Sequence, residues 1–302
     1  MTAQLERVGP AVAVRRPPRP RRSRRVAGRR RFHISPTVVA LTLVTALSAF
    51  PLYFMVVMAS RPNSDITSVP PPLTPGGELF NNIDRVLTNP DITFTQAVIN
   101  SVLVASVCTV SVVLFCSMAG FAFAKLRFVG RQPLLAFVLL TMMVPIQLGL
   151  IPLYMLMTKL HLAGTLPAVT LPFLVSGFGV FLMRQFCVQA LPDELLEAAR
   201  LDGASIVQTF WYVVLPVLRP AAAVLALLTF MERWNDFLWP YLVLDLDHPT
   251  VQVALSRLAG GYYTDQALIM AGTLLGVLPL LVVFILFGRQ IVGGIMEGGI
   301  KS

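Results

Sequence analysis

Three ionisable side chains lie close together inside a segment that is otherwise apolar. They are Glu232, Arg233 and Asp236, with Trp234 and Asn235 between them. Charged groups are costly in apolar surroundings, so they are by default candidates for function. Arg233 and Asp236 stand three positions apart, a spacing at which they could pair on one face of a helix. Aromatic, amide and carboxylate groups can together bind a polar solute, which makes Trp234, Asn235 and Asp236 candidate pathway residues.

A second interpretation of this stretch requires no ligand. Trp234, Trp239 and Tyr241 each combine an apolar ring with a polar tip. Such residues are typical of the aromatic belts at the two surfaces of a membrane. They could therefore serve as interfacial anchors and as packing, and the sequence leaves both interpretations open.

The cysteines and histidines form neither a metal-binding pattern nor a disulfide pattern. The cysteines are Cys108, Cys116 and Cys187, and no CxxC arrangement occurs. An odd count without characteristic spacing argues against a disulfide framework or a zinc site. The histidines are scattered singly and are expected to be polar surface residues: His33, His161 and His248. We therefore expect no metal site and no catalytic residue.

The chain also lacks a phosphate-binding loop. Its only lysines are Lys125, Lys159 and Lys301, and none of them stands in a GxxxxGK[ST] pattern. Any step driven by a nucleotide must therefore use a site on another polypeptide, and we expect this chain to bind no cofactor.

Composition places most of the chain in a membrane. Of 302 residues, 56% are hydrophobic and 13% are charged, and the mean hydropathy is +0.74. An ordinary soluble domain carries about 25% charged residues, and each membrane crossing takes about 20 apolar residues. Six apolar segments predict an all-α integral membrane protein with six spans: Thr37–Ala59, Ala97–Ala119, Pro133–Met157, Ala168–Phe186, Ala221–Leu242 and Ala267–Phe287.

The distribution of Lys and Arg predicts the orientation of these spans, because cytoplasmic loops carry an excess of basic residues. One side receives Lys125, Arg127, Arg131, Arg184, Arg200, Arg219, Arg289 and Lys301, and the other receives Arg61, Arg85, Lys159 and Arg257. This places both termini in the cytoplasm. It also predicts external loops at about 60–96, 158–167 and 243–266.

Residues 1–33 form a basic tail that precedes the predicted membrane domain of residues 34–302. Eleven arginines lie between Arg7 and Arg31, and the rest of the chain carries a formal net charge of −1. The Pro-Arg composition offers almost nothing to bury, so we predict disorder. The tail is expected to fix orientation and to contact anionic lipid. Nucleic-acid binding is disfavoured because no aromatic or folded module accompanies the charge.

The predicted cytoplasmic segment 187–220 is the longest connection on its side, and it has the pattern of two short helices around a glycine turn. Pro192 suits the first position of a helix, and Gly203 can adopt the left-handed conformation that ends it. Ser205 and Gln208 have the spacing of a capping box that starts a second helix. Within that helix one apolar stripe is predicted, formed by Val207, Phe210, Trp211 and Val214.

This segment resembles the EAA loop of the permease subunits of ABC importers. The match comprises Glu197-Ala198-Ala199, Asp202-Gly203-Ala204, Phe210, Leu215-Pro216 and Pro220. Other stretches are similar to the maltose-permease-like subunits of carbohydrate importers: Phe123–Arg131, Val144–Pro145, Ile151–Tyr154 and Trp234–Pro240. One departure is the charged pair Glu232-Arg233, where the family pattern leads us to expect uncharged residues.

The resemblance implies the fold of a type I ABC importer permease in the bacterial plasma membrane. It also implies partners: a second homologous permease, two ATPases that use ATP and Mg²⁺, and an external solute-binding protein. The loop would then be a coupling helix seated on an ATPase, with the contact formed by Glu197, Ala198, Ala199, Asp202, Gly203 and Ala204.

The implied solute is a sugar or an oligosaccharide. Glycerol phosphate or another polar solute is the alternative, because similar permeases also carry such solutes. A secondary transporter is less favoured, because it predicts acid and base groups in several spans, whereas this chain has one such cluster.

Overall fold

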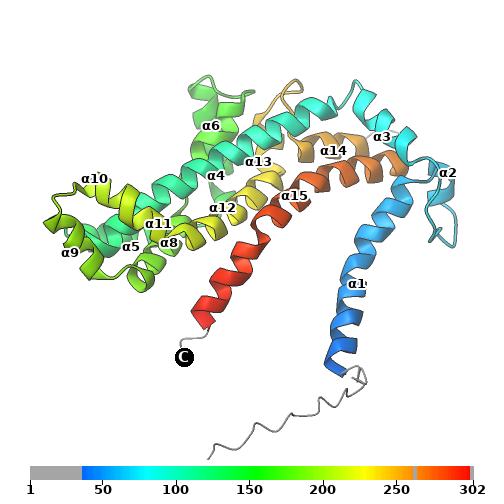
Figure 1. Ribbon diagram of the computed structural model, residues 1–302. Coiled ribbons are helices and arrows are strands. Elements are labelled where there is room, and N and C mark those ends of the chain that lie inside the picture. Colours follow the sequence, from blue (N-terminus) through cyan, green and yellow to red (C-terminus); the bar gives the residue numbers. More distant parts are fainter. Residues whose placement is uncertain (1–35, 261–263, 300–302) are drawn as a thin grey trace, which may run out of the picture. The chain divides into compact units, whose positions relative to one another are not determined.

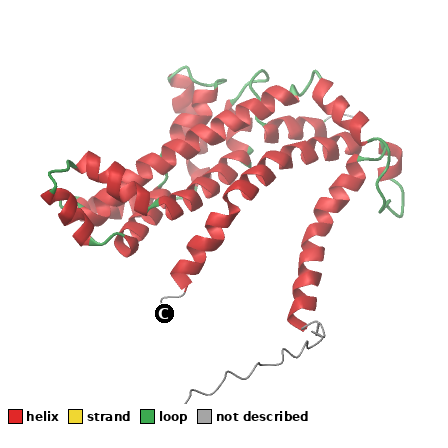
Figure 2. Cartoon of the chain, viewed as in Figure 1, coloured by secondary structure: helices red, strands yellow, loops and turns green. Residues whose placement is uncertain are grey.

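The computed structural model describes residues 36–260 and 264–299, so the predicted tail of residues 1–33 lies outside the described residues. The chain divides into two compact units, residues 1–48 and 49–302. All regular elements of the described residues are helices (Figures 1 and 2), and one isolated bridge joins Gly164 to Leu244.

The helices follow one another without a sheet. The first half of the chain contains α1 (Pro36–Ala59), α2 (Asn63–Ile66), α3 (Leu79–Thr88), α4 (Phe94–Lys125), α5 (Arg131–Thr141), the 3-10 turn η1 (Ile146–Gly149) and α6 (Leu150–Lys159). The second half contains α7 (Leu166–Thr170), η2 (Leu171–Phe173), α8 (Gly177–Ala190), α9 (Asp193–Leu201), α10 (Ile206–Thr209), the π-turn η3 (Phe210–Val214), α11 (Leu215–Val217), α12 (Arg219–Trp234), α13 (Leu238–Val243), α14 (Val251–Ala259) and α15 (Gln266–Gly299).

Four helical stretches of the described chain are long and apolar enough to cross a membrane. They are Pro36–Ala59, Phe94–Lys125, Leu166–Ala190 and Gln266–Leu286. Two bent pairs, Arg131–Thr141 with Ile146–Lys159 and Ile206–Val217 with Arg219–Trp234, would raise the number to six. The prediction of several membrane-spanning helices is therefore confirmed, and the count is between four and six.

Three of the predicted spans are not continuous helices, and the fourth, Ala168–Phe186, is interrupted between η2 and α8. The third, Pro133–Met157, bends by 91° between Thr141 and Ile146. Pro145 lacks an N–H and disfavours helical geometry in the residue before it, which explains a break at this point. The fifth, Ala221–Leu242, ends its first helix at Trp234 and resumes only at Leu238.

Helix α4 is the central element of the second unit, because its residues belong to all three buried apolar clusters. One cluster joins Val112 and Cys116 to α8 and to the α9–α12 region. Another joins Ala97 and Ala105 to α12, α14 and α15. The third joins Cys108 to α7 and α13.

Two glycines allow α4 and α8 to approach each other closely. A Cβ on Gly120 would lie 2.6 Å from the backbone nitrogen of Arg184, and a Cβ on Gly179 would lie 2.8 Å from the sulfur of Cys116. Neither distance is compatible with a real side chain. These residues therefore set the spacing of the α4–α8 pair.

Polar groups on α4 bind backbone that lies far along the chain. The Asn100 side-chain amide donates to the carbonyl of Pro249 at 2.9 Å, and the Val251 N–H donates to the Ser101 hydroxyl at 2.8 Å. Asn100 and Ser101 are both buried. These bonds fasten the start of α14 to α4.

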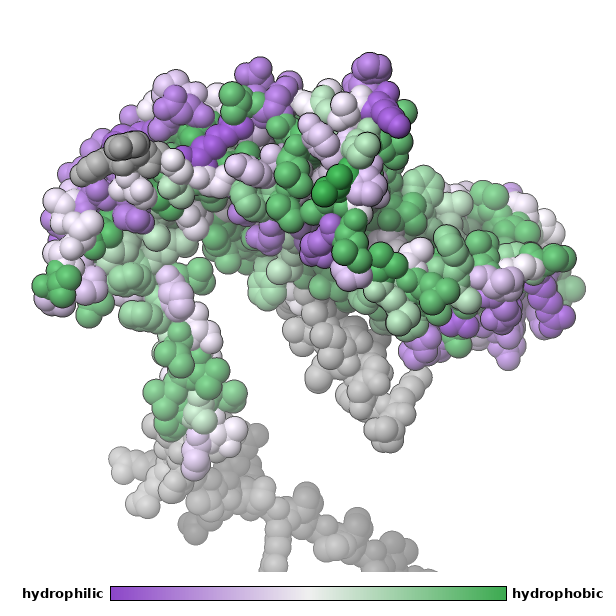
Figure 3. All heavy atoms as spheres, turned by 180° about the vertical axis from the view of Figure 1, so that it is seen from behind, coloured by the Kyte–Doolittle hydropathy of each residue, from purple (hydrophilic) through white to green (hydrophobic). Residues whose placement is uncertain are grey.

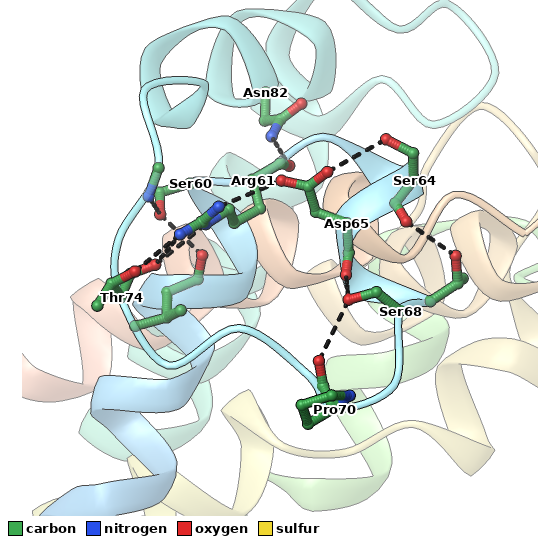
Figure 4. A network of polar contacts seen from close by, with 11 residues as sticks. Ser60, Arg61, Ser64, Asp65, Ser68, Pro70, Thr74 and Asn82 are labelled. Atoms are coloured by element: carbon green, nitrogen blue, oxygen red, sulfur yellow. Dashed lines mark hydrogen bonds and ion pairs between the residues drawn. The ribbon is translucent and has the colours of Figure 1, made fainter.

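The predicted external loop at 60–96 is ordered by a network of polar contacts around Arg61 (Figure 4). The Arg61 guanidinium donates to the Thr74 carbonyl at 2.8 Å and pairs with Asp65 at 3.2 Å. The Asn82 amide donates to the carbonyls of Ala59 and Arg61, both at 3.0 Å. The loop is thus fixed to the end of α1 and to α3, rather than being a loose connector.

The surface of the second unit suits a lipid environment. Hydrophobic residues cover much of the face shown in Figure 3, and hydrophilic residues gather mainly along its margins. Exposed apolar side chains on the helices include Leu103, Val110, Phe137, Leu281 and Ile285. Within this unit, α9 and α10 lie at one end and α2 and α3 at the other (Figure 1).

Candidate functional site

The first helix of the predicted coupling segment begins one residue later than expected. Pro192 is the N-cap, with φ −63° and ψ 144°, and α9 runs from Asp193 to Leu201. The Asp193 carboxylate accepts a hydrogen bond of 2.7 Å from Lys125, the last residue of α4. That bond, together with the positive charge of Lys125, lowers the pKa of Asp193 below its ordinary value of 3.8. The start of α9 is thus tied to the end of α4.

The turn after α9 has the left-handed glycine that the sequence predicts. Gly203 has φ +77°, and a Cβ built on it would meet no atom within 4 Å. The Gly203 and Ala204 N–H groups donate to the carbonyls of Arg200 and Ala199, at 3.0 and 2.9 Å. The constraint at this position is therefore conformational and not steric, because glycine alone adopts this φ without cost.

The second helix begins with the predicted capping box. The Ser205 hydroxyl accepts from the Gln208 N–H at 3.3 Å, and the Gln208 side chain accepts from the Ser205 N–H at 2.8 Å. After one turn of α10 the chain continues as the π-turn Phe210–Val214. A π-turn rotates side chains relative to an α-helix, which divides the predicted stripe: Phe210 and Val214 are buried, whereas Val207 and Trp211 are exposed.

The six predicted coupling residues do not all face outward. Glu197, Ala198, Asp202 and Gly203 are exposed, Ala204 is half-buried, and Ala199 is buried beneath them. Ala199 lies one turn from the buried Leu196, so these two residues seat α9 on the protein. Its small side chain is explained by packing within the chain.

Sequence reasoning missed several exposed apolar residues around this turn. Leu201 is 90% exposed and Tyr212 is 79% exposed, and Ile206 and Val207 are also open to solvent. Their signal was present in the sequence as apolar residues on both sides of the DGA turn. They give this end of the unit an apolar surface of the kind that marks a protein–protein contact.

A cavity of about 630 Å³ lies beside α9. Its walls mix basic, acidic and apolar side chains: Lys125, Leu126, Arg127, Phe128, Asp193, Leu196, Glu197, Arg200 and Ile206. The cavity therefore adjoins the exposed Glu197 and could receive a protruding segment of a partner.

The predicted pathway residues have three different environments. Trp234 is 1% exposed, stacks on Phe230 and donates its indole N–H to the Gly276 carbonyl at 3.1 Å. The Asn235 amide donates to the Met231 carbonyl at 2.8 Å. Arg233 and Asp236 form the expected ion pair at 3.1 Å. Trp234 therefore packs within the protein.

The alternative interpretation, an aromatic belt, does not hold for the two tryptophans. Trp239 is 2% exposed and donates its indole N–H to the Ala168 carbonyl at 3.1 Å. Of the three aromatic residues, Tyr241 alone is exposed, at 57%. The tryptophans serve as internal packing with satisfied N–H groups.

A second cavity, of about 240 Å³, lies next to this stretch. It is lined by Val112, Ile146, Pro172, Phe173, Val175, Ser176, Gly177, Thr229, Glu232 and Arg233. Glu232 and Arg233 are the charged residues in this lining, and the predicted pathway residues Trp234, Asn235 and Asp236 lie outside it. Elsewhere in the described chain, no group of three or more His, Cys, Asp or Glu residues could hold a metal ion.

Similarity to curated proteins covers most of the chain. It is 32% identical to the arabinooligosaccharides transport system permease protein AraQ of Halalkalibacterium halodurans, over 87% of this chain and 95% of that protein. It is 37% identical to the lactose transport system permease protein LacG of Rhizobium radiobacter, over 86% of this chain and 94% of that protein. It is 32% identical to the sn-glycerol-3-phosphate transport system permease protein UgpE of Yersinia pestis, over 86% and 94%.

The fold also has a counterpart among solved structures. A chain of a bacterial ABC transporter involved in the import of the acidic polysaccharide alginate superposes with a TM-score of 0.73 at 23% identity, over 84% of this chain and 94% of that chain. Residues 113–293 match the family described as the inner membrane component of binding-protein-dependent transport systems. With the EAA-type turn around Gly203 and relatives at up to 37% identity, this chain belongs to that family of ABC transporter permeases.

Proposed function

We propose that this chain is a permease subunit of an ABC importer that carries a sugar or an oligosaccharide across the bacterial inner membrane. The carbohydrate assignment is supported by the relatives named for arabinooligosaccharides and for lactose. The observation that carries the proposed mechanism is the helix–glycine–helix turn, which exposes Glu197, Ala198 and Asp202 beside the exposed apolar Leu201.

The proposed complex contains this chain, a second homologous permease, two ATPase subunits and an external solute-binding protein. ATP and Mg²⁺ are bound by the ATPases. This chain catalyses no reaction itself, in keeping with a sequence in which no lysine stands in a phosphate-binding loop. Its part is to open a path alternately to either side of the membrane.

The coupling step follows from how α9 is held. Its exposed face docks on the ATPase, while Leu196 and Ala199 hold the helix on the protein and Asp193 binds Lys125 of α4. A displacement of the docked helix is therefore passed to the end of α4. It is also passed through the π-turn and the 79° bend into α12, so α4 and α12, two of the elements that line the 240 Å³ cavity, are driven together.

A second candidate solute is glycerol phosphate, which is favoured by the similarity to the sn-glycerol-3-phosphate permease. The two candidates differ in charge. Purifying the cognate solute-binding protein and measuring its affinity for lactose, arabinooligosaccharides and sn-glycerol 3-phosphate would distinguish them.

The coupling role can be tested by substituting Gly203 with valine. A β-branched residue at a φ of +77° costs roughly 1–2 kcal/mol, a factor of about 5–30 in an equilibrium. We expect Gly203→Val to weaken copurification of the ATPase and to reduce solute-stimulated ATP hydrolysis in proteoliposomes by that factor.

Gly130→Val is the matched control. Gly130 has φ +83° and also has no atom within 4 Å of a Cβ, so the backbone strain is equal. It lies between α4 and α5, outside the α9–α10 turn. Equal loss of stimulation in both variants, or none in Gly203→Val, would refute the assignment of coupling to this turn.

A further inference from the structure

The charged cluster at the end of α12 holds an unbalanced negative charge. The Arg233 side chain is 7% exposed, and its guanidinium pairs with both Glu232 and Asp236. Its central carbon also lies 4.2 Å from the centre of the Phe173 ring. Two carboxylates thus share one cation, and each of its two terminal nitrogens already donates to one of them.

The cavity of about 240 Å³ forms where several helices are interrupted. Ile146 follows the break between α5 and η1, and Val175 and Ser176 lie in the break between η2 and α8. Non-helical backbone at membrane depth is tolerated only where it is buried in protein or lines a water-filled cavity. Such breaks are also where transporters bind their solutes.

The backbone at one of these breaks is already satisfied from α4. The Ser111 hydroxyl donates to the Leu174 carbonyl at 2.9 Å, and the Cys116 thiol donates to the Ser176 carbonyl at 3.4 Å. The Ser176 hydroxyl in turn caps α8 by accepting from the Gly179 N–H at 3.3 Å. The carbonyls of this break therefore each have one partner on α4, and the Ser176 hydroxyl has one on α8.

Glu232 is the charged group that remains available. Its side chain is 66% exposed, and its one ion pair is with Arg233. An ionised carboxylate can accept about four hydrogen bonds. Glu232 thus offers acceptor capacity to donors within the cavity, which are what a hydroxyl-rich solute supplies, and it repels a phosphate or a carboxylate.

We propose that this cavity is a solute-contact site on the transport path, and that Glu232 selects neutral, hydroxyl-rich solutes over anionic ones. The proposal rests on the proposed importer function and narrows its solute class. It assigns selectivity to Glu232, with Arg233 as the residue that positions it, in place of Trp234, Asn235 and Asp236.

The first test asks whether Glu232 faces a water-filled path. The complete complex in proteoliposomes is treated with a hydrophilic, membrane-impermeant methanethiosulfonate after Glu232→Cys substitution. Cys108, Cys116 and Cys187 are all buried, so the unsubstituted chain supplies the background. Ile285→Cys, on α15 and 73% exposed, is the control for a position on the exposed apolar surface, away from the cavity.

We expect Glu232→Cys to react in at least one state of the ATP cycle and Ile285→Cys to remain unreactive in all of them. If Glu232→Cys is unreactive in every state, Glu232 is covered by lipid or by the partner permease, and the proposal is overturned.

The second test measures the charge inside the cavity. Val175→Cys provides a thiol that lines the cavity and is 54% exposed. Its rates with a cationic trimethylammonium reagent and an anionic sulfonate reagent are compared with and without Glu232→Gln. We expect the cation-to-anion rate ratio to fall at least about tenfold in Glu232→Gln. Asp84→Asn, a remote exposed acid on α3, should leave the ratio unchanged.

The outcomes separate this proposal from the importer function. If no solute-loaded binding protein stimulates ATP hydrolysis by the wild-type complex, the importer function itself fails. If stimulation is normal but the rate ratio does not change in Glu232→Gln, or if the wild-type complex imports sn-glycerol 3-phosphate as readily as lactose or arabinooligosaccharides, the proposed selectivity alone is overturned.

Discussion

The buried polar side chains Trp234, Trp239 and Arg233 each have specific contact partners within the protein. Trp234 and Trp239 are each buried with an indole N–H that reaches a backbone carbonyl. Arg233 is buried because two carboxylates and an aromatic ring surround it. Buried polar groups persist when they are hydrogen-bonded, so these residues reveal their roles by their contacts.

Replacing Trp234 with phenylalanine tests whether it packs or contacts solute. Trp234→Phe removes the N–H that donates to the Gly276 carbonyl, and loss of such a hydrogen bond costs about 0.5–1.5 kcal/mol. We expect a lower melting temperature of the purified complex and an unchanged KM for solute. Tyr241→Phe, at an exposed ring, should change neither quantity. A raised KM without a change in melting temperature would show instead that Trp234 contacts the solute.

The Lys125–Asp193 pair predicts a pH dependence at the coupling end. The pKa of Asp193 is lower in the folded protein than its ordinary value of 3.8, so the carboxylate stabilises the fold above that pH. The contribution disappears as the pH falls through the lower, folded pKa. We expect Asp193→Asn to lower the melting temperature slightly at pH 7, and the difference from wild type to shrink on acidification below pH 3.8.

A difference that stays constant down to the acid limit would show that the asparagine acts through lost packing or helix capping. Since Asp193 is largely exposed, salt should also reduce the effect at pH 7.

At the scale of elements, the spacing of α4 and α8 depends on the absence of side chains. Gly120 faces the backbone of Arg184, and Gly179 faces Cys116. Interiors are packed too densely to absorb an extra carbon without movement. The α4–α8 pair therefore behaves as one body that carries the α9 turn at its end.

Gly120→Ala is expected to separate this pair. The added methyl would lie 2.6 Å from the Arg184 nitrogen, and overpacking of this kind costs about 1–3 kcal/mol. Gly149→Ala is the matched control, because a Cβ there meets no atom within 4 Å. Thermal unfolding of the purified complex should show a loss for the first variant alone. Equal melting temperatures would mean that α8 shifts without cost.

The larger unit, residues 49–302, is a helical bundle whose two ends differ in chemistry. One end of the larger unit has the exposed apolar and acidic turn around Gly203, and the other has the Arg61 network and α3 (Figures 1 and 4). The excess of basic residues in the segments on its side predicts that the first end lies in the cytoplasm.

The orientation and the number of spans can be tested with fused reporters. We expect green fluorescent protein fused to either terminus to fluoresce, and alkaline phosphatase fused there to be inactive, because six spans place both ends in the cytoplasm. Alkaline phosphatase inserted after Asp247, in the predicted external loop, should be active. An active phosphatase at one terminus alone would indicate an odd number of crossings.

Local sequence patterns predicted the coupling turn well, because its determinants are local. The left-handed Gly203 and the Ser205–Gln208 capping box depend on residues within one helical turn, and both are confirmed. The pairing of Arg233 with Asp236 is confirmed for the same reason.

Features set by distant neighbours were not predicted. The burial of Trp234 depends on Gly276, and the burial of Ala199 depends on how α9 is seated. The position of Glu232 at a cavity depends on three separate interruptions of the chain, which no pattern within one segment could bring together.

The bonds from α4 to the start of α14 also constrain the order of synthesis. Asn100 is synthesised 149 residues before Pro249, whose carbonyl it binds. Ser101 is synthesised 150 residues before Val251, whose N–H donates to its hydroxyl. At roughly 5–20 residues per second, that interval is about 7–30 s. Throughout it, the Asn100 side-chain N–H group and the Ser101 hydroxyl lack the partners that they have in the folded chain. We therefore expect the packing of α4 against the start of α14 to be among the last steps of folding.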